Sequence, residues 1–342
     1  DLHKEYRRQR QMCIRDRGLF CSLLIGTIIN TLGTQFHISF LTTAVATVND
    51  TQYTVGSLAS AMSGPAMAVA IGYALHCPPL VLFSLITVGF ASNALGGAGG
   101  PLAVLFVAIF ASEIGKAVSK ETKIDILVTP LVTIGVGVAL SAWWAPALGS
   151  AAMKVGNIIM WATNLQPFLM GIIVSVLMGM ILTLPISSAA LGVILNLSGL
   201  AAGAATVGCC CNMVGFAVAS YRENKVGGLL AQGIGTSMLQ VPNIVKKPVI
   251  WLPAIISSAI LGPVGTMVLH MTNNATGSGM GTAGLVGQIM TWQTMIQTES
   301  AQMVLIKILL IQIVLPAVVT LGVSEFMRKK DWIKMGDMKL EF

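Results

Sequence analysis

Charged side chains are scarce in this sequence. Aspartate, glutamate, lysine and arginine together make up 10% of the 342 residues, whereas a soluble domain carries roughly 25%. Hydrophobic residues make up 55% of the chain. Because a helix that crosses a bilayer needs roughly 20 mostly apolar residues, this composition excludes an ordinary soluble domain and indicates a polytopic membrane protein.

Motifs for catalysis and metal binding are missing as well. The sequence contains no P-loop, HExxH motif, nucleophile elbow or dinucleotide fingerprint in a suitable context. Its cysteines include the adjacent run Cys209, Cys210 and Cys211, which lacks the spacing of a zinc site or a disulfide framework. We therefore predict no catalytic residue, no metal site and no cofactor, and we interpret the cysteines as small packing residues.

The first 17 residues form a basic polar run directly before an apolar segment. A targeting signal and a polybasic membrane tether are two possible interpretations. Back-translation of residues 7–17 instead fits a sequencing adapter of the transposase type read in frame, and residues 1–3 fit another part of it. We predict that residues 1–17 are an artefact and that the natural N-terminus is missing. Removing their six basic and three acidic residues lowers the formal charge from +7 to +4, which leaves no argument for nucleic-acid binding.

Apolar stretches of spanning length follow one another along the rest of the chain. They cover residues 18–32, 55–75, 80–95, 101–118, 126–144, 168–184, 204–221, 249–271 and 303–323. Shorter or broken apolar pieces cover residues 36–48, 150–161, 186–199, 227–239 and 280–295. We predict an all-α, polytopic transmembrane helix bundle of about 9–10 spans with re-entrant or broken segments. Broken segments at membrane depth must be buried in protein or line a wet cavity, so they indicate a translocation path.

After residue 17, most lysines and arginines occur in a few loops and at the C-terminus. They occur in residues 116–123, 222–225, 246–247 and 328–339. Because cytoplasmic loops carry an excess of these residues, we place all four groups on the cytoplasmic side of the membrane. We expect a membrane-embedded domain over residues 18–327 and a basic cytoplasmic tail over residues 328–342.

Three polar islands interrupt the apolar sequence, at residues 235–248, 270–289 and 184–199. The first island, broken at Pro242, is either a ligand or gate segment or an ordinary loop. The second is glycine-rich, which exposes backbone N–H groups and favours a re-entrant binding loop over a plain extracellular turn. The third is either a re-entrant hairpin tip or the start of a tightly packed helix. The first two islands supply our candidate ligand-binding residues, Thr236, Gln240, Asn243, Asn273, Asn274 and Ser278.

Isolated ionisable residues near the membrane are costly and are often functional. Glu299 lies directly before the apolar stretch that starts at Met303, and Lys307 lies inside that stretch. We predict a cavity role for this pair, whereas Glu113 and Lys116 form a helix-end pair that reaches water. His37 either binds a ligand, carries a proton or serves as a structural hydrogen-bonding group.

The segment VGCCCNMVGFAVASYRENKVGGLLAQGIGTSMLQVPNIVKKPVIW, continued by MTNNATGSGMGTAGLVGQI, resembles the second enzyme IIC family of the phosphoenolpyruvate sugar phosphotransferase system. This family includes the perfringolysin regulator-like membrane proteins, and the resemblance extends from about Gly18 to the C-terminus. It implies a multi-pass protein of the bacterial cytoplasmic membrane with an enzyme IIC-like fold, a homodimeric state, and separate enzyme IIA and IIB partners. The sequence departs from glucose-type relatives because it has no Gly-Ile-Thr-Glu motif and no fused phosphoryl-carrying domain.

We therefore predict a permease component that binds a small polar solute, expected to be a sugar, near the middle of the bilayer and moves it by alternating access. The six candidate residues and Glu299 would contact this solute. Two alternatives stay open: a membrane sensor that binds a ligand without transport, and an ion-coupled secondary transporter with His37 or Glu299 as the coupling group. The expected partners are the solute, the enzyme IIA and IIB proteins and membrane lipid, with no nucleic acid.

Overall fold

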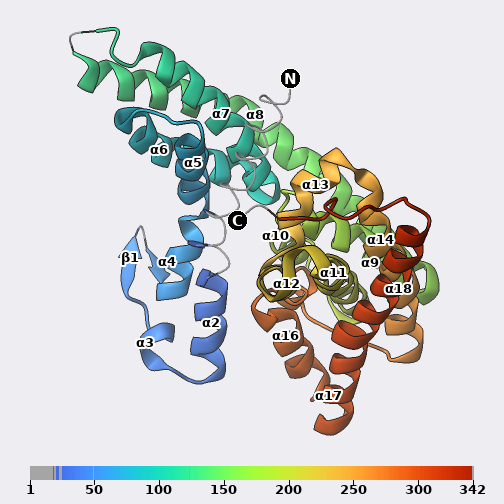
Figure 1. Ribbon diagram of the computed structural model, residues 1–342. Helices are drawn as coiled ribbons and strands as arrows, with labels where there is room; N and C mark the ends of the chain where they lie inside the picture. Colours follow the sequence, from blue (N-terminus) through green and yellow to red (C-terminus); the bar gives the residue numbers. More distant parts are fainter. Residues whose placement is uncertain (1–17, 19–20, 23–24, 49, 123, 341–342) are drawn as a thin grey trace. The chain divides into compact units, whose positions relative to one another are not determined.

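The computed structural model describes residues 18, 21–22, 25–48, 50–122 and 124–340 (Figure 1). The predicted adapter-derived residues 1–17 lie outside the described residues. The chain divides into two compact units, residues 1–152 and residues 153–342. Within the described residues, the only sheet is a hairpin of strands β1 (Ala46–Val48) and β2 (Thr51–Tyr53), with Val48 opposite Thr51. All other regular structure is helical, which confirms the prediction of an all-α bundle.

The first unit consists of short helices followed by a helical hairpin. Its elements are α2 (Ile25–Gln35), α3 (Ser39–Thr42), the β-hairpin, α4 (Val55–Ala61), α5 (Ser63–Ala74), α6 (Pro79–Gly96), η2 (Gly97–Gly99), α7 (Gly100–Val118) and the first part of α8 (Asp125–Thr163). The predicted span over residues 55–75 is divided between α4 and α5, which form a 49° bend.

Helices α6 and α7 form an antiparallel pair. The chain reverses at Gly97, whose φ of +50° suits glycine. A Cβ added to Gly115 near the end of α7 would lie 2.8 Å from Val81 near the start of α6, so the two helices pack along their length. The helices contain 18 and 19 residues, so each is about 27–29 Å long and matches the hydrocarbon core of a bilayer.

Helix α8 joins two pieces that the sequence pattern predicts as separate. It contains 39 residues and includes both Pro130 and Pro146. The predicted span 126–144 and the predicted broken piece 150–161 are therefore one continuous helix, about 58 Å long at 1.5 Å per residue. Proline is tolerated inside apolar helices of this kind because other groups can satisfy the freed backbone carbonyls.

The second unit contains the rest of α8 and the three polar islands. Its further elements are α9 (Pro167–Thr183), α10 (Ser188–Ile194), α11 (Gly199–Ala219), α12 (Tyr221–Leu230), η3 (Ala231–Gly235), η4 (Ser237–Gln240), α13 (Val241–Lys246), η5 (Pro248–Trp251), α14 (Leu252–Pro263), η6 (Val264–Val268), α15 (Ala275–Ser278), η7 (Ala283–Leu285), α16 (Val286–Met295), α17 (Ala301–Leu309), η8 (Leu310–Val314) and α18 (Leu315–Lys329). Among these, η3, η6 and η8 are π-helical turns.

Helix α11 is the core of the second unit. Of its 21 residues, 18 are buried, and it packs against α9, α14 and α18. Its many glycine and alanine residues allow this close approach, as is usual for helices that pack inside a membrane. A Cβ at Gly208 would overlap the carbonyl oxygen of Ser175 in α9. The three adjacent cysteines of α11 are fully buried.

Five described stretches are long and apolar enough to cross a membrane, or six if the bent pair α4–α5 counts as one span. The 9–10 spans predicted from the sequence exceed this number for three reasons. The α6–α7 hairpin is a single apolar stretch in this count, α9 has 17 residues, and α2 has 11. The bundle is polytopic by either count.

The C-terminal segment, residues 330–340, folds back onto the second unit. In Figure 1 it is the dark red trace that leaves α18 and passes α13. Ile333, Met338 and Leu340 are buried, and the first two pack with Phe216 and Trp251. The predicted cytoplasmic tail is therefore packed into the core at the end of α11.

Substituting Gly208 with alanine should lower the thermal stability of the detergent-solubilised protein markedly, because the added methyl group would collide with the backbone of α9. We expect a loss of about 1–3 kcal/mol. Gly322→Ala in α18 is the control, since an added Cβ at Gly322 meets nothing within 4 Å. Equal unfolding temperatures for the two variants would contradict the close packing of α11 on α9.

Candidate functional site

The three polar islands meet on α11 in the second unit. The hydroxyl of Ser237 in the first island lies 2.8 Å from that of Thr183, which donates to Asn212 of α11 at 3.2 Å. Asn273 of the second island donates to Thr206 of α11 at 2.7 Å. Ser188 of the third island donates to the carbonyl oxygen of Gly279 at 2.6 Å, which joins the third island to the second. Segments far apart in the sequence thus surround one buried helix.

Asn273 is the centre of the network in the second island. It is 1% exposed, and its amide nitrogen lies within hydrogen-bond distance of three acceptors, which share its two hydrogens: the Thr206 hydroxyl, the Thr291 hydroxyl at 3.0 Å and the Gly287 carbonyl oxygen at 3.2 Å. Its amide oxygen accepts from the backbone N–H of Asn274 at 2.8 Å. Every polar group of this side chain therefore has a partner within the protein.

The other candidate residues of the second island hold its backbone. Asn274 is the N-cap of α15, because its side-chain oxygen accepts from the N–H of Gly277 at 2.9 Å. The Ser278 hydroxyl donates to the Ala275 carbonyl oxygen at 2.8 Å. The loop then turns at Gly281, where φ is +53° and an added Cβ would lie 2.8 Å from Cys209. The geometry shows an unwound segment packed directly on α11.

The candidate residues of the first island form a chain of side-chain amides. Gln232 donates to Ser220 and accepts from Gln240, both at 2.8 Å. Gln240 in turn accepts from Asn243 at 2.8 Å. Thr236 caps η4, since its hydroxyl accepts from the N–H of Met238. Gln232 and Gln240 are fully buried, so the chain links the end of α11 to the broken segment η3–η4–α13.

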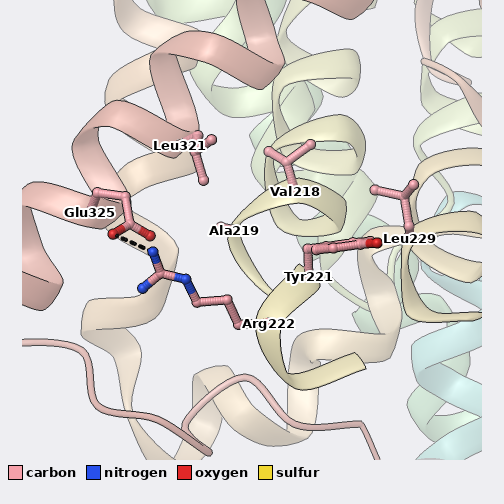
Figure 2. Close-up of a pocket in the computed structure, with 7 residues that line it drawn as sticks. All are labelled: Val218, Ala219, Tyr221, Arg222, Leu229, Leu321 and Glu325. Atoms are coloured by element: carbon pink, nitrogen blue, oxygen red, sulfur yellow. Dashed lines mark ion pairs between the residues drawn. The ribbon is translucent and has the colours of Figure 1, made fainter. Parts of the chain in front are cut away.

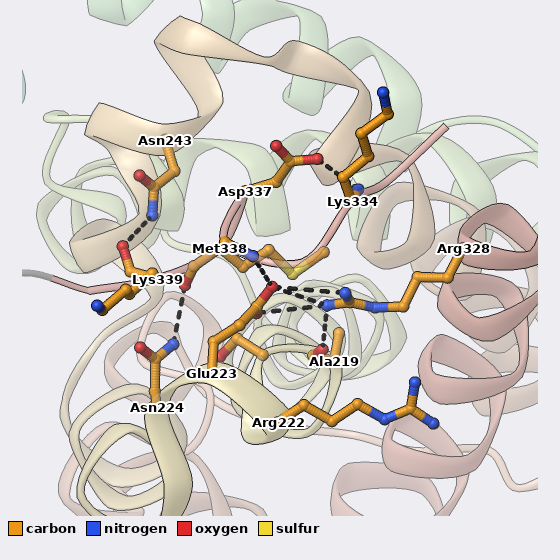
Figure 3. A network of polar contacts seen from close by, with 12 residues as sticks. Ala219, Arg222, Glu223, Asn224, Asn243, Arg328, Lys334, Asp337, Met338 and Lys339 are labelled. Atoms are coloured by element: carbon orange, nitrogen blue, oxygen red, sulfur yellow. Dashed lines mark hydrogen bonds and ion pairs between the residues drawn. The ribbon is translucent and has the colours of Figure 1, made fainter. Parts of the chain in front are cut away.

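The C-terminal segment completes this chain at the basic end of the unit, as Figure 3 shows. Gln240 donates to the Met338 carbonyl oxygen at 3.0 Å and Asn243 to the Lys339 carbonyl oxygen at 3.0 Å. Asn224 donates to the Met338 carbonyl oxygen and accepts from the Leu340 N–H, both at 2.8 Å. The segment therefore holds α12 and the first island together.

Two ion pairs stabilise the same region. Arg328 pairs with Glu223 at 3.3 Å, with both side chains less than 10% exposed, and Glu223 also accepts from the Gly336 N–H. Lys247 pairs with Asp337 at 2.6 Å. Burial raises the pKa of Asp337, but hydrogen bonds from Lys247 and the Lys334 N–H, together with the charges of Lys247 and Arg328, outweigh it and lower the pKa below its ordinary value.

A pocket of about 620 Å³ opens beside this network, at the C-terminal end of α11 (Figure 2). Its lining residues belong to α11, α12 and α18 and are Val218, Ala219, Tyr221, Arg222, Leu229, Leu321 and Glu325. Arg222 and Glu325 form an ion pair at 3.0 Å across it. None of the residues predicted from the sequence lines this pocket.

Glu299 belongs to the second unit and His37 to the first. Glu299 pairs with Lys307 at 2.7 Å, and their side chains are 27% and 14% exposed. The second carboxylate oxygen of Glu299 is buried and has no hydrogen-bond partner in the described part of the chain. His37 is exposed in the first unit with a φ of +51°.

Several polar residues of the site were not predicted from the sequence. They are Thr183, Thr206, Asn212, Gln232, Gln288, Thr291 and Gln312. Each is buried. The available signal was a lone amide or hydroxyl inside an apolar run, such as Gln312 in LLIQIVLP, since an uncompensated polar group at membrane depth is costly.

Comparison with known proteins gives one match. A family model described as "Phosphotransferase system, EIIC" matches residues 15–340. No curated protein and no solved structure matches the chain.

Asn273→Asp should strongly destabilise the protein, because a carboxylate cannot donate to the two hydroxyls and the carbonyl oxygen that Asn273 contacts. We expect a loss of about 3 kcal/mol or more, measured as thermal unfolding in detergent. Asn274→Asp is the isosteric control, since an aspartate can still cap α15. The role of Asn273 as the centre of the network would be refuted if both variants unfolded at the wild-type temperature.

Asp337→Asn should loosen the C-terminal segment at neutral pH, because the ion pair with Lys247 is lost. The pair is partly exposed, so trypsin cleavage after Lys334 or Lys339 should accelerate only about twofold to fivefold. Because the pKa of Asp337 is lowered in the folded state, its contribution is present above the ordinary value of 3.8 and is lost as the pH falls through the lower folded value.

The wild-type protein should therefore show no change in the stability of this segment from Asp337 titration between pH 5 and 8. Asp331→Asn removes the same charge from an exposed position of the same segment and is the control. Equal cleavage rates for the two variants would rule out a stabilising role for the Lys247–Asp337 pair.

Proposed function

Because the chain belongs to the phosphotransferase system EIIC family, an integral component of the cytoplasmic membrane, we propose that it binds a small neutral solute, a sugar, between the polar islands and α11. The protein then passes the solute to the cytoplasm by alternating access. The observation that carries this proposal is the meeting of three interrupted polar segments on one buried helix.

The chemistry of the islands supports a neutral polyhydroxylated solute. The side chains around α11 are amides and hydroxyls rather than charged groups, and they match sugar hydroxyls as hydrogen-bond donors and acceptors. Neutral hydrogen bonds are weak individually, so a solute held by them can also be released. The segments that enclose this solute are shaped by Thr236, Gln240, Asn243, Asn273, Asn274 and Ser278, and Glu299 is the acidic residue included among the proposed solute contacts.

The depth of the islands also supports transport. Helix α11 is 21 residues long, or about 31 Å, and Thr206 and Cys209, which contact the second island, lie near its middle. Unwound segments near the bilayer midplane are typical of the binding sites of transporters, because half-helices and free backbone groups can face the solute there. Alternating access would move these segments relative to their surroundings.

Phosphoryl transfer to the solute would come from separate enzyme IIA and IIB proteins. The buried cysteines of α11 are not exposed to a phosphoryl donor. The basic cytoplasmic loops and the packed C-terminal segment are the surface on which such partners would act. A homodimer is the expected assembly of an EIIC protein.

Uptake of labelled sugars into proteoliposomes tests this proposal. We expect the reconstituted protein to exchange one or more of glucose, mannose, galactose, fructose and mannitol across the membrane in a counterflow assay, without any ion gradient. Adding phosphoenolpyruvate and the partner proteins should convert exchange into accumulation of the phosphorylated sugar.

The other outcomes contradict the proposal in distinct ways. Accumulation that needs a proton or sodium gradient and no phosphoenolpyruvate would show an ion-coupled transporter. Binding without counterflow, even with the partner proteins present, would show a membrane sensor.

A further inference from the structure

Two buried glutamines present side-chain oxygens that nothing in the described residues satisfies. The Oε1 atoms of Gln288 and Gln312 have no hydrogen-bond partner there, although the side chains are only 8% and 0% exposed. A buried acceptor without a donor destabilises the fold. Serine and threonine hydroxyls in helices can rotate to the carbonyl oxygen four residues earlier, whereas a glutamine oxygen has no such local donor.

The orientation of the Gln312 amide follows from its neighbours. The Thr291 hydroxyl donates its one hydrogen to the Gly287 carbonyl oxygen at 2.7 Å, so it can only accept further bonds. It accepts from Asn273 at 3.0 Å and from the Nε2 atom of Gln312 at 2.9 Å. In this arrangement the free polar atom of Gln312 is its carbonyl oxygen.

Gln288 lies on the same side of α16 as Thr291. The two residues are three positions apart, a spacing that places side chains side by side on a helix. The Nε2 atom of Gln288 donates to the Sγ atom of Cys210 at 3.4 Å, and sulfur is a weak acceptor. Gln288, which belongs to the second polar island, thus shares one side of α16 with Thr291, and Gln312 donates to Thr291 from η8.

Both glutamines lie near the middle of the membrane-spanning region. Gln312 belongs to the π-helical turn η8, inside an apolar stretch of 29 residues from Ala301 to Lys329. Gln288 contacts Cys210, the twelfth residue of the 21-residue α11. π-helical turns inside α-helices occur frequently at functional sites, and polar side chains at this depth usually serve a function.

We propose that the Oε1 atoms of Gln288 and Gln312 form an acceptor pair that binds hydroxyl groups of an unphosphorylated, neutral sugar or polyol. This inference rests on the proposed function and assigns two solute-binding residues to it. A solute hydroxyl supplies the donor that each oxygen lacks. The pair also sets specificity, because carbonyl oxygens repel the oxygens of a phosphate group. A phosphorylated product therefore binds more weakly here than its precursor.

The test uses Gln288→Leu and Gln312→Leu in the full-length protein in detergent, with equilibrium binding of labelled glucose, mannose, galactose, fructose and mannitol. Each substitution should weaken binding of the preferred sugar about tenfold. It should change the unfolding temperature only slightly, because the loss of the Nε2 bond to Thr291 or Cys210 is offset by the removal of a buried oxygen that has no partner. The control is Ser92→Ala, a fully buried serine of α6 in the first unit whose hydroxyl is hydrogen-bonded to the Val88 carbonyl oxygen and to Ser141. It should lower the unfolding temperature and leave sugar affinity unchanged.

Deoxyfluoro derivatives of the preferred sugar separate direct contact from an indirect effect. Fluorine in place of a hydroxyl accepts hydrogen bonds but cannot donate. At the ring position whose hydroxyl contacts Gln312, replacing the hydroxyl with fluorine should weaken binding of the sugar to the wild type. The same replacement should have little effect on the affinity of Gln312→Leu, which already lacks the contact. Equal losses in wild type and variant at every position would overturn the contact.

The acceptor pair and the proposed sugar-binding function are overturned by different results. Wild-type binding of a sugar with unchanged affinity in both leucine variants overturns the acceptor pair and leaves the proposed function standing. If the wild type binds none of the five compounds, the proposed function fails and the acceptor pair fails with it.

Discussion

A polar group at the depth of the bilayer must find its partner inside the protein, because lipid offers none. This constraint explains the arrangement of the second unit around α11. Broken segments such as residues 270–285 expose backbone groups that a regular helix would satisfy, and here Asn273, Asn274 and Ser188 supply the missing partners. The small residues of α11 bring those segments close enough for the bonds to form.

The same constraint separates side chains that hold the structure from those free to bind a solute. Asn273 is an attractive ligand-binding residue in the sequence, yet all of its hydrogen bonds are made within the fold. Gln312 is adjacent to this network and keeps one oxygen free, because Thr291 has already donated its hydrogen. Saturated networks are rigid, so they position a free acceptor accurately without binding the solute themselves.

At the C-terminal end of α11, the polar groups find their partners in the chain's own C-terminal segment. The amide chain from Gln232 to Asn243 ends on backbone carbonyl oxygens of residues 338 and 339, and the buried Arg328–Glu223 pair lies in the same region. The C-terminal segment is therefore bonded directly to a polar island, so a change in one is felt by the other.

The sequence by itself determined the class of the protein, the family resemblance, and the places where apolar helices are interrupted, because composition and local breaks are properties of short stretches. It could not determine that residues 126–144 and 150–161 form one helix, because proline and glycine are compatible with either outcome inside an apolar run. Only the tertiary structure decided which amides are saturated and which remain free. That distinction depends on hydrogen bonds from Asn273 and Gln312 to Thr291, which lie in different elements of the chain. A local sequence pattern does not predict such contacts.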